Sequence, residues 1–223
     1  MSYMFNKEGK SMLKKLTIPL IIFLFIVSCE KSPKKNIQTT LPKPTLTLKS
    51  GDYTMDNDNS SIKWTGRELS TKSHYGSLQM KDGSITINTD GTVNGIIKID
   101  MTTIDCEDLQ GRSKASLERH LRSDDFFSVE SHPIATLTFK SEGGIGAGNK
   151  LAFNGDLEIK GISHPISFES EVKNVDPKVS ALVNMTFDRS KYNVRFRSGT
   201  FFQNLGDKLI YDDIEISVDI RTL

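Results

Sequence analysis

Cysteine is scarce in this 223-residue sequence, which contains only Cys29 and Cys106. Two cysteines cannot form the disulfide framework of a small secreted scaffold, so the fold must be stabilised by its hydrophobic core. Charge of either sign is not in excess, because 29 Lys and Arg residues face 28 Asp and Glu residues. A chain without a basic surplus offers no electrostatic case for nucleic acid, and we expect no nucleic-acid partner.

Long hydrophobic runs are also lacking, apart from residues 16–27. That run follows Lys14 and Lys15 and is shorter than the ~20 residues that span a bilayer, which is typical of a signal peptide. It ends in the sequence IVSC, which resembles a bacterial lipobox. We therefore predict that residues 1–28 are removed and that Cys29 becomes an acylated N-terminus. The expected location is the bacterial cell envelope, membrane-anchored and facing the periplasm.

Removing residues 1–28, which hold four Lys and one Glu, leaves a nearly neutral chain of 25 basic and 27 acidic residues. Residues 29–50 are rich in Lys, Pro and Thr and show no apolar period. Such a composition favours an extended tether between the lipid anchor and a folded domain.

Most of the remaining sequence alternates between apolar and polar residues, which predicts β-strands with one buried face. We expect turns at Lys81-Asp82-Gly83, at Asn88-Thr89-Asp90-Gly91 and at Asp176-Pro177. Eight or nine strands joined mainly by short turns predict an all-β, antiparallel meander that closes into a barrel of about eight strands. The predicted strands are residues 62–67, 75–80, 84–88, 93–101, 134–139, 151–159, 162–172, 179–187 and 214–220.

One segment breaks this alternation. Ala115, Leu117 and Leu121 recur at nearly helical spacing, so we predict one short helix there. Phe126 and Phe127 follow it in an irregular stretch, where neighbouring aromatic rings either fill a core or contact an apolar partner. A helix and an aromatic pair between strands indicate the mouth of the barrel.

Two separated groups of residues stand in an order that is typical of one protein family. They are Leu121, Asp125-Phe126-Phe127, Pro133, Thr138-Phe139 and Ser141, followed by the stretch from Asn154 to Ile162 and by Pro165. This order resembles the YceI-like family. The resemblance extends over residues 51–223 and departs from the family pattern after Asp188-Arg189, where residues 190–208 carry an aromatic and basic insertion. It implies an exported, lipocalin-like barrel that binds a long-chain isoprenoid, such as a quinone or a polyprenyl phosphate.

If the barrel closes, aromatic and apolar residues from separate strands should converge on its interior. Arg195 and Arg197 are either the solvated face of an ordinary strand or a cationic rim that meets a head group. The expected ligand-binding residues are Trp64, Leu121, Phe126, Phe127, Phe139, Phe153, Phe168, Phe187, Arg195 and Arg197.

No residue pattern predicts a metal site, a cofactor or catalysis. The four histidines, His74, His120, His132 and His164, do not stand at metal-ligand spacing, so structural roles are favoured. No nucleophile is placed beside a base in the sequence, and Cys106 is interpreted as a small residue near a strand end. Two alternatives stay open: a ligand-free structural or interaction barrel, and a barrel enzyme acting on a hydrophobic substrate.

Overall fold

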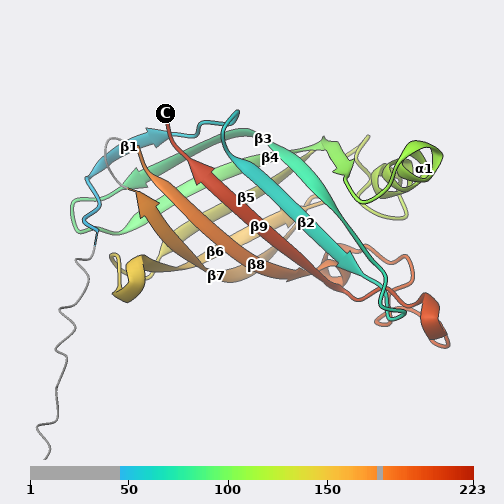
Figure 1. Cartoon of the computed structure of the whole chain (residues 1–223). Coiled ribbons are helices and arrows are strands. Elements are labelled where there is room, and N and C mark those ends of the chain that lie inside the picture. The colour runs from blue at the N-terminus through green and yellow to red at the C-terminus, as the bar shows by residue number, and fades with distance from the viewer. Residues whose placement is uncertain (1–45, 175–177) are drawn as a thin grey trace, which may run out of the picture. The chain divides into compact units, whose positions relative to one another are not determined.

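A computed structural model describes residues 46–174 and 178–223 of the chain. It contains nine antiparallel strands, one α-helix and three short 3₁₀ helices, arranged as shown in Figure 1. The strands are β1 (Gly51–Thr54), β2 (Ser61–Arg67), β3 (Ser73–Ile87), β4 (Val93–Cys106), β5 (Ile134–Ser141), β6 (Lys150–Ile159), β7 (Ile162–Asn174), β8 (Ser180–Asp188) and β9 (Asp213–Arg221). The helices are α1 (Gly111–Arg122), η1 (Ala147–Asn149), η2 (Arg189–Tyr192) and η3 (Gly206–Lys208).

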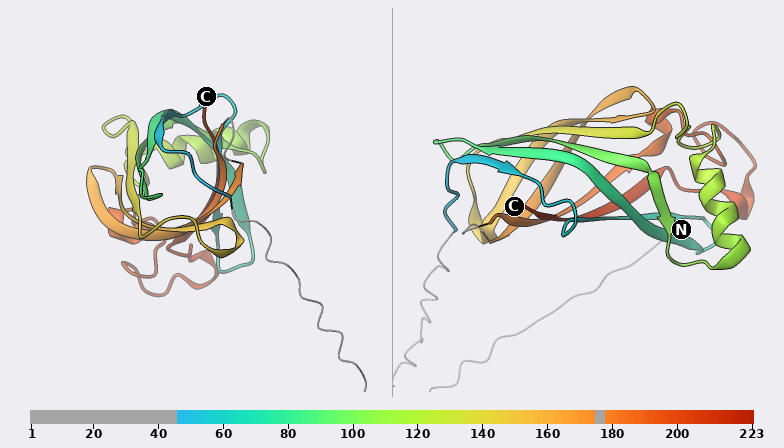
Figure 2. Two further views of the ribbon diagram at one scale, coloured as in Figure 1. Left: turned by 90° about the vertical axis from the view of Figure 1, so that its left-hand side faces the viewer. Right: turned by 90° about the horizontal axis from the view of Figure 1, so that it is seen from above.

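The strands form one closed ring, seen end-on in the left view of Figure 2. Neighbours in sequence pair from β2 to β9, and β9 pairs back to β2, so the sheet has no open edge along the ring. Strand β1 occupies the same position in the ring as β2, because β1 pairs with residues 84–87 of β3 and β2 with residues 73–78. The ring thus has eight strand positions, which confirms the predicted antiparallel barrel.

Strand β3 corrects one predicted turn. The expected turn at Lys81-Asp82-Gly83 is wrong, because β3 continues through these residues as a single strand. Its register against β4 shifts between Ser77 and Gln79 and again between Met80 and Asp82. Such bulges absorb extra residues and bend a strand without ending it, so polar turn-forming residues here mark a bend.

The next predicted turn is confirmed at residues 88–91, where the amide of Gly91 donates to the carbonyl of Asn88 at 3.0 Å. Gly91 has a φ of 81°, which a glycine adopts without steric cost. Strand β1 was not predicted, since its four residues are mostly exposed and show no apolar alternation. The predicted turn at Asp176-Pro177 lies outside the described residues.

The two ends of the barrel differ in what covers them. At one end, which we call the α1 end, lie α1 and the long connection of residues 189–212 between β8 and β9. At the opposite end, the η1 end, the described chain begins with Leu46, whose amide donates to Asn149 Oδ1 at 3.2 Å. Leu46 and Leu48 pack against the hydrophobic core there. The right view of Figure 2 shows the two ends separated by the full length of the strands.

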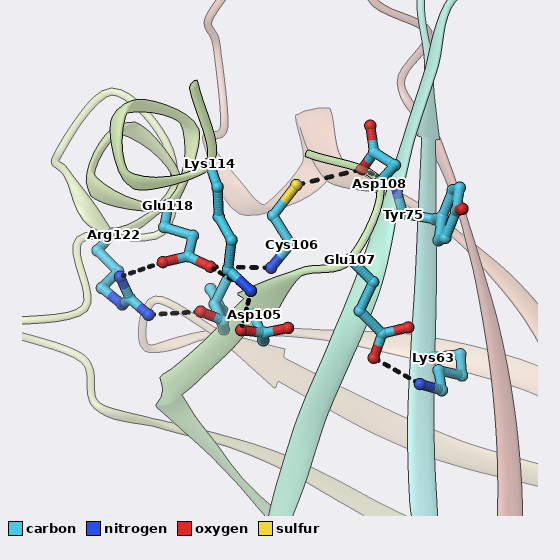
Figure 3. Close-up of polar contacts among 10 residues, drawn as sticks. Lys63, Tyr75, Asp105, Cys106, Glu107, Asp108, Lys114, Glu118 and Arg122 are labelled. Carbon is cyan, nitrogen blue, oxygen red and sulfur yellow. Dashed lines mark hydrogen bonds and ion pairs between the residues drawn. The ribbon is translucent and has the colours of Figure 1, made fainter. Parts of the chain in front are cut away.

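Helix α1 confirms the predicted helix and is fixed to the end of β4. Glu118 Oε1 accepts a hydrogen bond from the amide of Cys106 at 3.0 Å, and Lys114 Nζ lies 2.7 Å from Asp105 Oδ1 (Figure 3). Arg122 donates to the carbonyl of Ile104. These contacts hold the helix beside the barrel with Leu121 buried against the core.

The predicted signal peptide, the acylated Cys29 and most of the predicted tether, residues 29–50, lie outside the described residues. Within residues 46–174 and 178–223, no helix combines the length and the apolar character required to cross a membrane.

Candidate functional site

The barrel interior encloses a cavity of about 170 Å³ at the α1 end. It forms because alternate residues of each strand point inward and are almost all apolar. Only four of the lining residues that the structure describes are ionisable. The cavity is lined by Ile62, Trp64, Gly66, Arg67, Glu68, His74, Leu78, Met80, Ile97, Ile99, Met101, Ile104, Leu117, Leu121, Phe126, Phe127, Ala135, Leu137, Leu157, Ile159, Met185, Phe187, Arg189, Ile210, Ile214, Ile216 and Val218.

The four ionisable residues all stand near the α1 end of their strands. Arg67 ends β2 and Glu68 follows it, His74 is the second residue of β3, and Arg189 comes directly after β8. The deeper walls are built by aliphatic and aromatic side chains. This separation of ionisable residues at the α1 end from apolar residues deeper in the barrel suits an elongated ligand. Its apolar part would enter the barrel while its polar part stayed at the α1 end.

A smaller cavity of about 60 Å³ continues the interior toward the η1 end. Three predicted aromatics converge there: the Phe139 and Phe153 rings lie 5.3 Å apart, and Phe153 stacks on Phe168 at 5.2 Å. Gly95 faces this cluster, and a β-carbon at Gly95 would lie only 2.6 Å from Phe139. Four residues in the middle of the barrel line both cavities: Ile97, Leu137, Met185 and Val218.

The side walls of the larger cavity include two further predicted residues, Trp64 on β2 and Phe187 on β8. The indole Nε1 of Trp64 is buried and has no hydrogen-bond partner among the described residues. Tryptophan N–H groups usually find a partner when they are buried. All five aromatics predicted from the strand faces therefore line the interior, Trp64 and Phe187 in the larger cavity and the other three in the smaller one.

The predicted aromatic pair closes the α1 end. Phe126 and Phe127 line the larger cavity together with Leu121 of α1, as the sequence predicts. The Phe126 ring is 4.9 Å from the His120 ring and 5.5 Å from that of Phe196 in the long connection. Rings from two separate segments thus meet at the α1 end of the cavity.

Arg189 anchors that long connection from inside the barrel. It is fully buried and donates to the carbonyls of Tyr211, Val194 and Ile210 at 3.1, 3.3 and 3.1 Å. Its guanidinium also lies 3.3 Å from Asp212 Oδ1. Burial lowers the pKa of Arg189 below its ordinary value, against the raising effect of Asp212.

Arg195 and Arg197 do not occupy a strand, which corrects the expectation that they share one strand face. Between β8 and β9 the chain forms η2, η3 and isolated bridges, and Arg197 has a left-handed φ of 51°. Arg195 lies over the Phe201 ring at 4.7 Å and Arg197 over the Phe196 ring at 5.0 Å. Both arginines line a separate open depression of about 450 Å³ outside the barrel.

That depression has a mixed lining. Asp124, Asp125 and Lys160 line it together with the two arginines and Phe196. Burial lowers the pKa of Lys160, whose Nζ donates to the carbonyl of Asn193 at 3.2 Å. Phe196 links the depression to the cavity, because it also contacts Phe126. A head group in the depression would therefore be separated from a chain in the cavity by this aromatic layer.

His74, Cys106 and Asp108 form a polar cluster at the α1 end that the sequence analysis missed. His74 Nδ1 lies 2.7 Å from Asp108 Oδ2. The Cys106 thiol donates to Asp108 Oδ1 at 3.1 Å (Figure 3). Burial, reinforced by Asp108, raises the pKa of Cys106 to about 11. Burial alone would raise the pKa of Asp108, but hydrogen bonds from the Tyr75 amide, His74 and Cys106 lower it.

Fold and cavity together define a class of protein: a lipocalin-like antiparallel barrel with an apolar interior. A model of the YceI-like domain matches residues 53–222, so this chain belongs to the YceI-like family.

Two curated relatives show how far the sequences of this family diverge. A UPF0312 protein of Photorhabdus laumondii is 28% identical over 152 residues, which cover 65% of this chain and 72% of the relative. Protein YceI of Escherichia coli O157:H7 is 24% identical over 123 residues, which cover 54% of this chain and 61% of that relative.

Two solved structures share the fold. BcnA of Burkholderia cenocepacia has a TM-score of 0.57 and 17% identity, and the comparison covers 76% of this chain and 99% of BcnA. A polyisoprenoid binding domain from Saccharophagus degradans has a TM-score of 0.54 and 13% identity, with coverage of 76% and 97%. At such identities the likeness shows the barrel architecture alone.

Proposed function

We propose that this protein binds a long-chain isoprenoid, a quinone or a polyprenyl phosphate, with its hydrocarbon chain inside the barrel. The observation that carries the proposal is the apolar cavity of about 170 Å³, whose ionisable residues are confined to the α1 end. The polyisoprenoid binding domain of Saccharophagus degradans, which has the same fold, supports this ligand class. We further propose that Cys29 is acylated and holds the barrel at the periplasmic face of a bacterial membrane.

The size of the cavity sets how much of the chain it accepts without movement. One water molecule requires about 10–15 Å³ of such a cavity, so 170 Å³ accommodates roughly a dozen carbon-sized groups. Burying a dozen CH₂ groups contributes on the order of 10 kcal/mol, less the cost of immobilising ligand and side chains. Micromolar binding corresponds to about 8 kcal/mol, so the gain from the apolar walls is of that order before these costs are subtracted.

The rival functions fit the interior less well. A ligand-free structural barrel would have a filled interior, whereas this interior keeps an apolar cavity beneath Phe126 and Phe127. A barrel enzyme would need two convergent ionisable groups free to act. Arg189 is engaged by three backbone carbonyls, and His74 is bonded to Asp108. We therefore propose a binding protein and not an enzyme.

A cavity-filling variant tests the proposal. Ala135 is buried and lines the cavity, so Ala135→Phe should occupy the space of the ligand chain. We expect at least about tenfold weaker binding of a long-chain menaquinone, measured by quenching of Trp64 fluorescence. Ala152 lies on the exposed face of β6, so Ala152→Phe is the matched control and should bind normally. Lipid extracted from the wild-type protein, purified from its own host, should contain an isoprenoid.

Two results would contradict the proposal. One is equal menaquinone binding by wild type and Ala135→Phe while both keep their melting temperatures, which would place the ligand elsewhere. The other is the recovery of protein from host membranes without any bound isoprenoid.

A further inference from the structure

The cluster of His74, Cys106 and Asp108 combines three types of metal-binding atom. An imidazole nitrogen, a thiol sulfur and a carboxylate oxygen all lie within 4.8 Å of one another. His74 is the second residue of β3, Cys106 ends β4, and Asp108 follows two residues later. His74 also lines the larger cavity, whereas Cys106 and Asp108 do not, and the amide of Cys106 is bonded to Glu118 of α1.

The register of β3 and β4 explains why these side chains converge. Gly76 pairs with Cys106, and the amide of Glu107 donates to the carbonyl of Tyr75 at 2.9 Å. Continued by one further pair, this register places His74 opposite Asp108. Residues opposite one another on antiparallel strands, and residues two apart on one strand, share a face of the sheet. The three side chains therefore share one face by construction.

We propose that His74, Cys106 and Asp108 bind a divalent metal ion of the zinc class, with one coordination position left for water or another oxygen ligand. Zinc binds nitrogen, sulfur and oxygen at roughly 2.0–2.3 Å in tetrahedral geometry, which places ligand atoms roughly 3.3–3.7 Å apart. The distances from the Asp108 carboxylate to His74 Nδ1 and to the Cys106 sulfur, 2.7 and 3.1 Å, are slightly shorter than that spacing. No two of the three ligand atoms are more than 4.8 Å apart. Movements of the three ligand atoms by a few tenths of an ångström up to about 1 Å would bring them to the tetrahedral spacing.

Neighbouring groups already orient the ligands. The amide of Tyr75 donates to Asp108 Oδ1 at 3.0 Å, which fixes the carboxylate, and Glu118 holds the amide of Cys106 (Figure 3). Such outer contacts normally accompany metal ligands and set their direction. The cluster is also reachable from solvent, because the side chains of His74 and Asp108 are 33% and 13% exposed.

Binding one Zn²⁺ balances as a proton exchange without any redox step. The metal replaces the thiol proton of Cys106, which solvent accepts, while His74 binds as a neutral imidazole through one ring nitrogen and keeps its proton on the other. The metal site does not rest on the isoprenoid proposal, since it requires no lipid and shares only His74 with the cavity lining.

Cobalt spectroscopy tests the site directly. The purified domain, freed of metal by a chelator, is titrated with Co²⁺ and separately with Zn²⁺. We expect saturation at one ion per chain, visible absorption typical of tetrahedral Co²⁺, and a near-ultraviolet band from thiolate bound to cobalt. Zn²⁺ should displace Co²⁺ and raise the melting temperature of the protein.

Three variants assign the ligands. Cys106→Ser should abolish the near-ultraviolet band, while His74→Gln, at a partly exposed position, should weaken Co²⁺ binding by more than about 100-fold. Even the loss of an outer contact costs about 10–100-fold in metal affinity. His132→Gln removes a histidine outside the cluster and should leave the spectrum unchanged.

The proposal is overturned if the wild-type domain takes up less than one tightly bound ion. It is equally overturned if Co²⁺ binds without a thiolate band, or if folded His74→Gln binds both metals as tightly as wild type. In each of these cases the three residues form only a hydrogen-bonded cluster.

Discussion

Arg189 shows at the scale of one residue how the α1 end is held together. A buried guanidinium is costly unless its donors are paired, and here backbone carbonyls and Asp212 supply the partners. Arg189→Ala would leave those acceptors and Asp212 without their donor. We expect the free energy of unfolding to fall by about 3–5 kcal/mol, measured by urea denaturation.

Arg221 is the matched control, because its pair with Asp219 is exposed to solvent. Exposed ion pairs contribute about 0–1 kcal/mol, so Arg221→Ala should change stability by less than about 1 kcal/mol. A similar small loss in Arg189→Ala would show that the connection of residues 189–212 is held by its other contacts.

Arg195 and Arg197 carry the prediction about the ligand head group. Charge-assisted hydrogen bonds contribute about 1.5–3 kcal/mol each, and arginine engages two phosphate oxygens at once. Replacing both residues by Gln should weaken binding of a polyprenyl phosphate by about 10- to 100-fold and spare a menaquinone of similar chain length. Binding is measured by competition in detergent micelles.

Lys208→Gln provides the control, since this exposed residue of η3 does not line the depression beside the arginines. If the double variant weakens both ligands equally, or neither, then the arginines do not select the head group.

At the scale of one element, α1 is attached at few points to the barrel whose cavity it closes. Glu118 alone engages Cys106, Lys114 and Arg122. Glu118→Ala would leave the buried amide of Cys106 without an acceptor, which costs about 1–3 kcal/mol. We expect the helix to detach more often and menaquinone to dissociate several-fold faster, measured by stopped-flow fluorescence.

Glu118→Gln keeps an oxygen acceptor for Cys106 and loses only the charge, so its dissociation rate should lie close to that of wild type. Arg112→Gln, at an exposed position in the first turn, should have no effect. Equal rates for Glu118→Ala and wild type would mean that the ligand leaves by another route.

Strands with a long apolar alternation were predictable from the sequence, whereas a strand held mainly by its hydrogen bonds to a neighbour was not. Apolar and polar residues alternate along residues 151–159 and again along 214–220, so local periodicity alone identifies β6 and β9. Strand β1 has too few buried residues to show a period, and it is held by its hydrogen bonds to β3. The aromatic residues of the cavity were predictable for the same reason as the strands.

The His74 cluster lay beyond sequence analysis because it depends on register. Extending the pairing of Ile87 with Val93 along the hairpin would set Gly76 opposite Ile104. The irregularities in β3 and β4 shift the partner to Cys106, and this brings Asp108 beside His74. Bulges of this kind leave little trace in hydrophobic pattern, so only the folded sheet reveals the cluster.

At the scale of the whole molecule, the proposed acylation of Cys29 would determine where the barrel is located. Substituting Cys29→Ser should prevent acylation and move the protein from the membrane fraction to the soluble fraction, measured by detergent phase separation of cell extracts. The reason is that each buried CH₂ of an acyl chain contributes about 0.8 kcal/mol to membrane binding. Continued membrane partition of the variant would show that another feature attaches the protein.

The attachment of the chain at the η1 end has a consequence for the route by which a ligand is exchanged. Seventeen residue steps separate Cys29 from Leu46, and a fully extended chain covers at most about 3.6 Å per step, or about 60 Å. The 15 residues of β3 extend about 50 Å along the strand, and less along a tilted barrel axis. If Cys29 is acylated as proposed, a barrel whose η1 end faced the bilayer would present its α1 end to the periplasm. A fully extended tether would also be long enough for the α1 end to reach the same membrane. The proposed anchor would therefore allow exchange of a ligand either with the membrane or with a periplasmic acceptor.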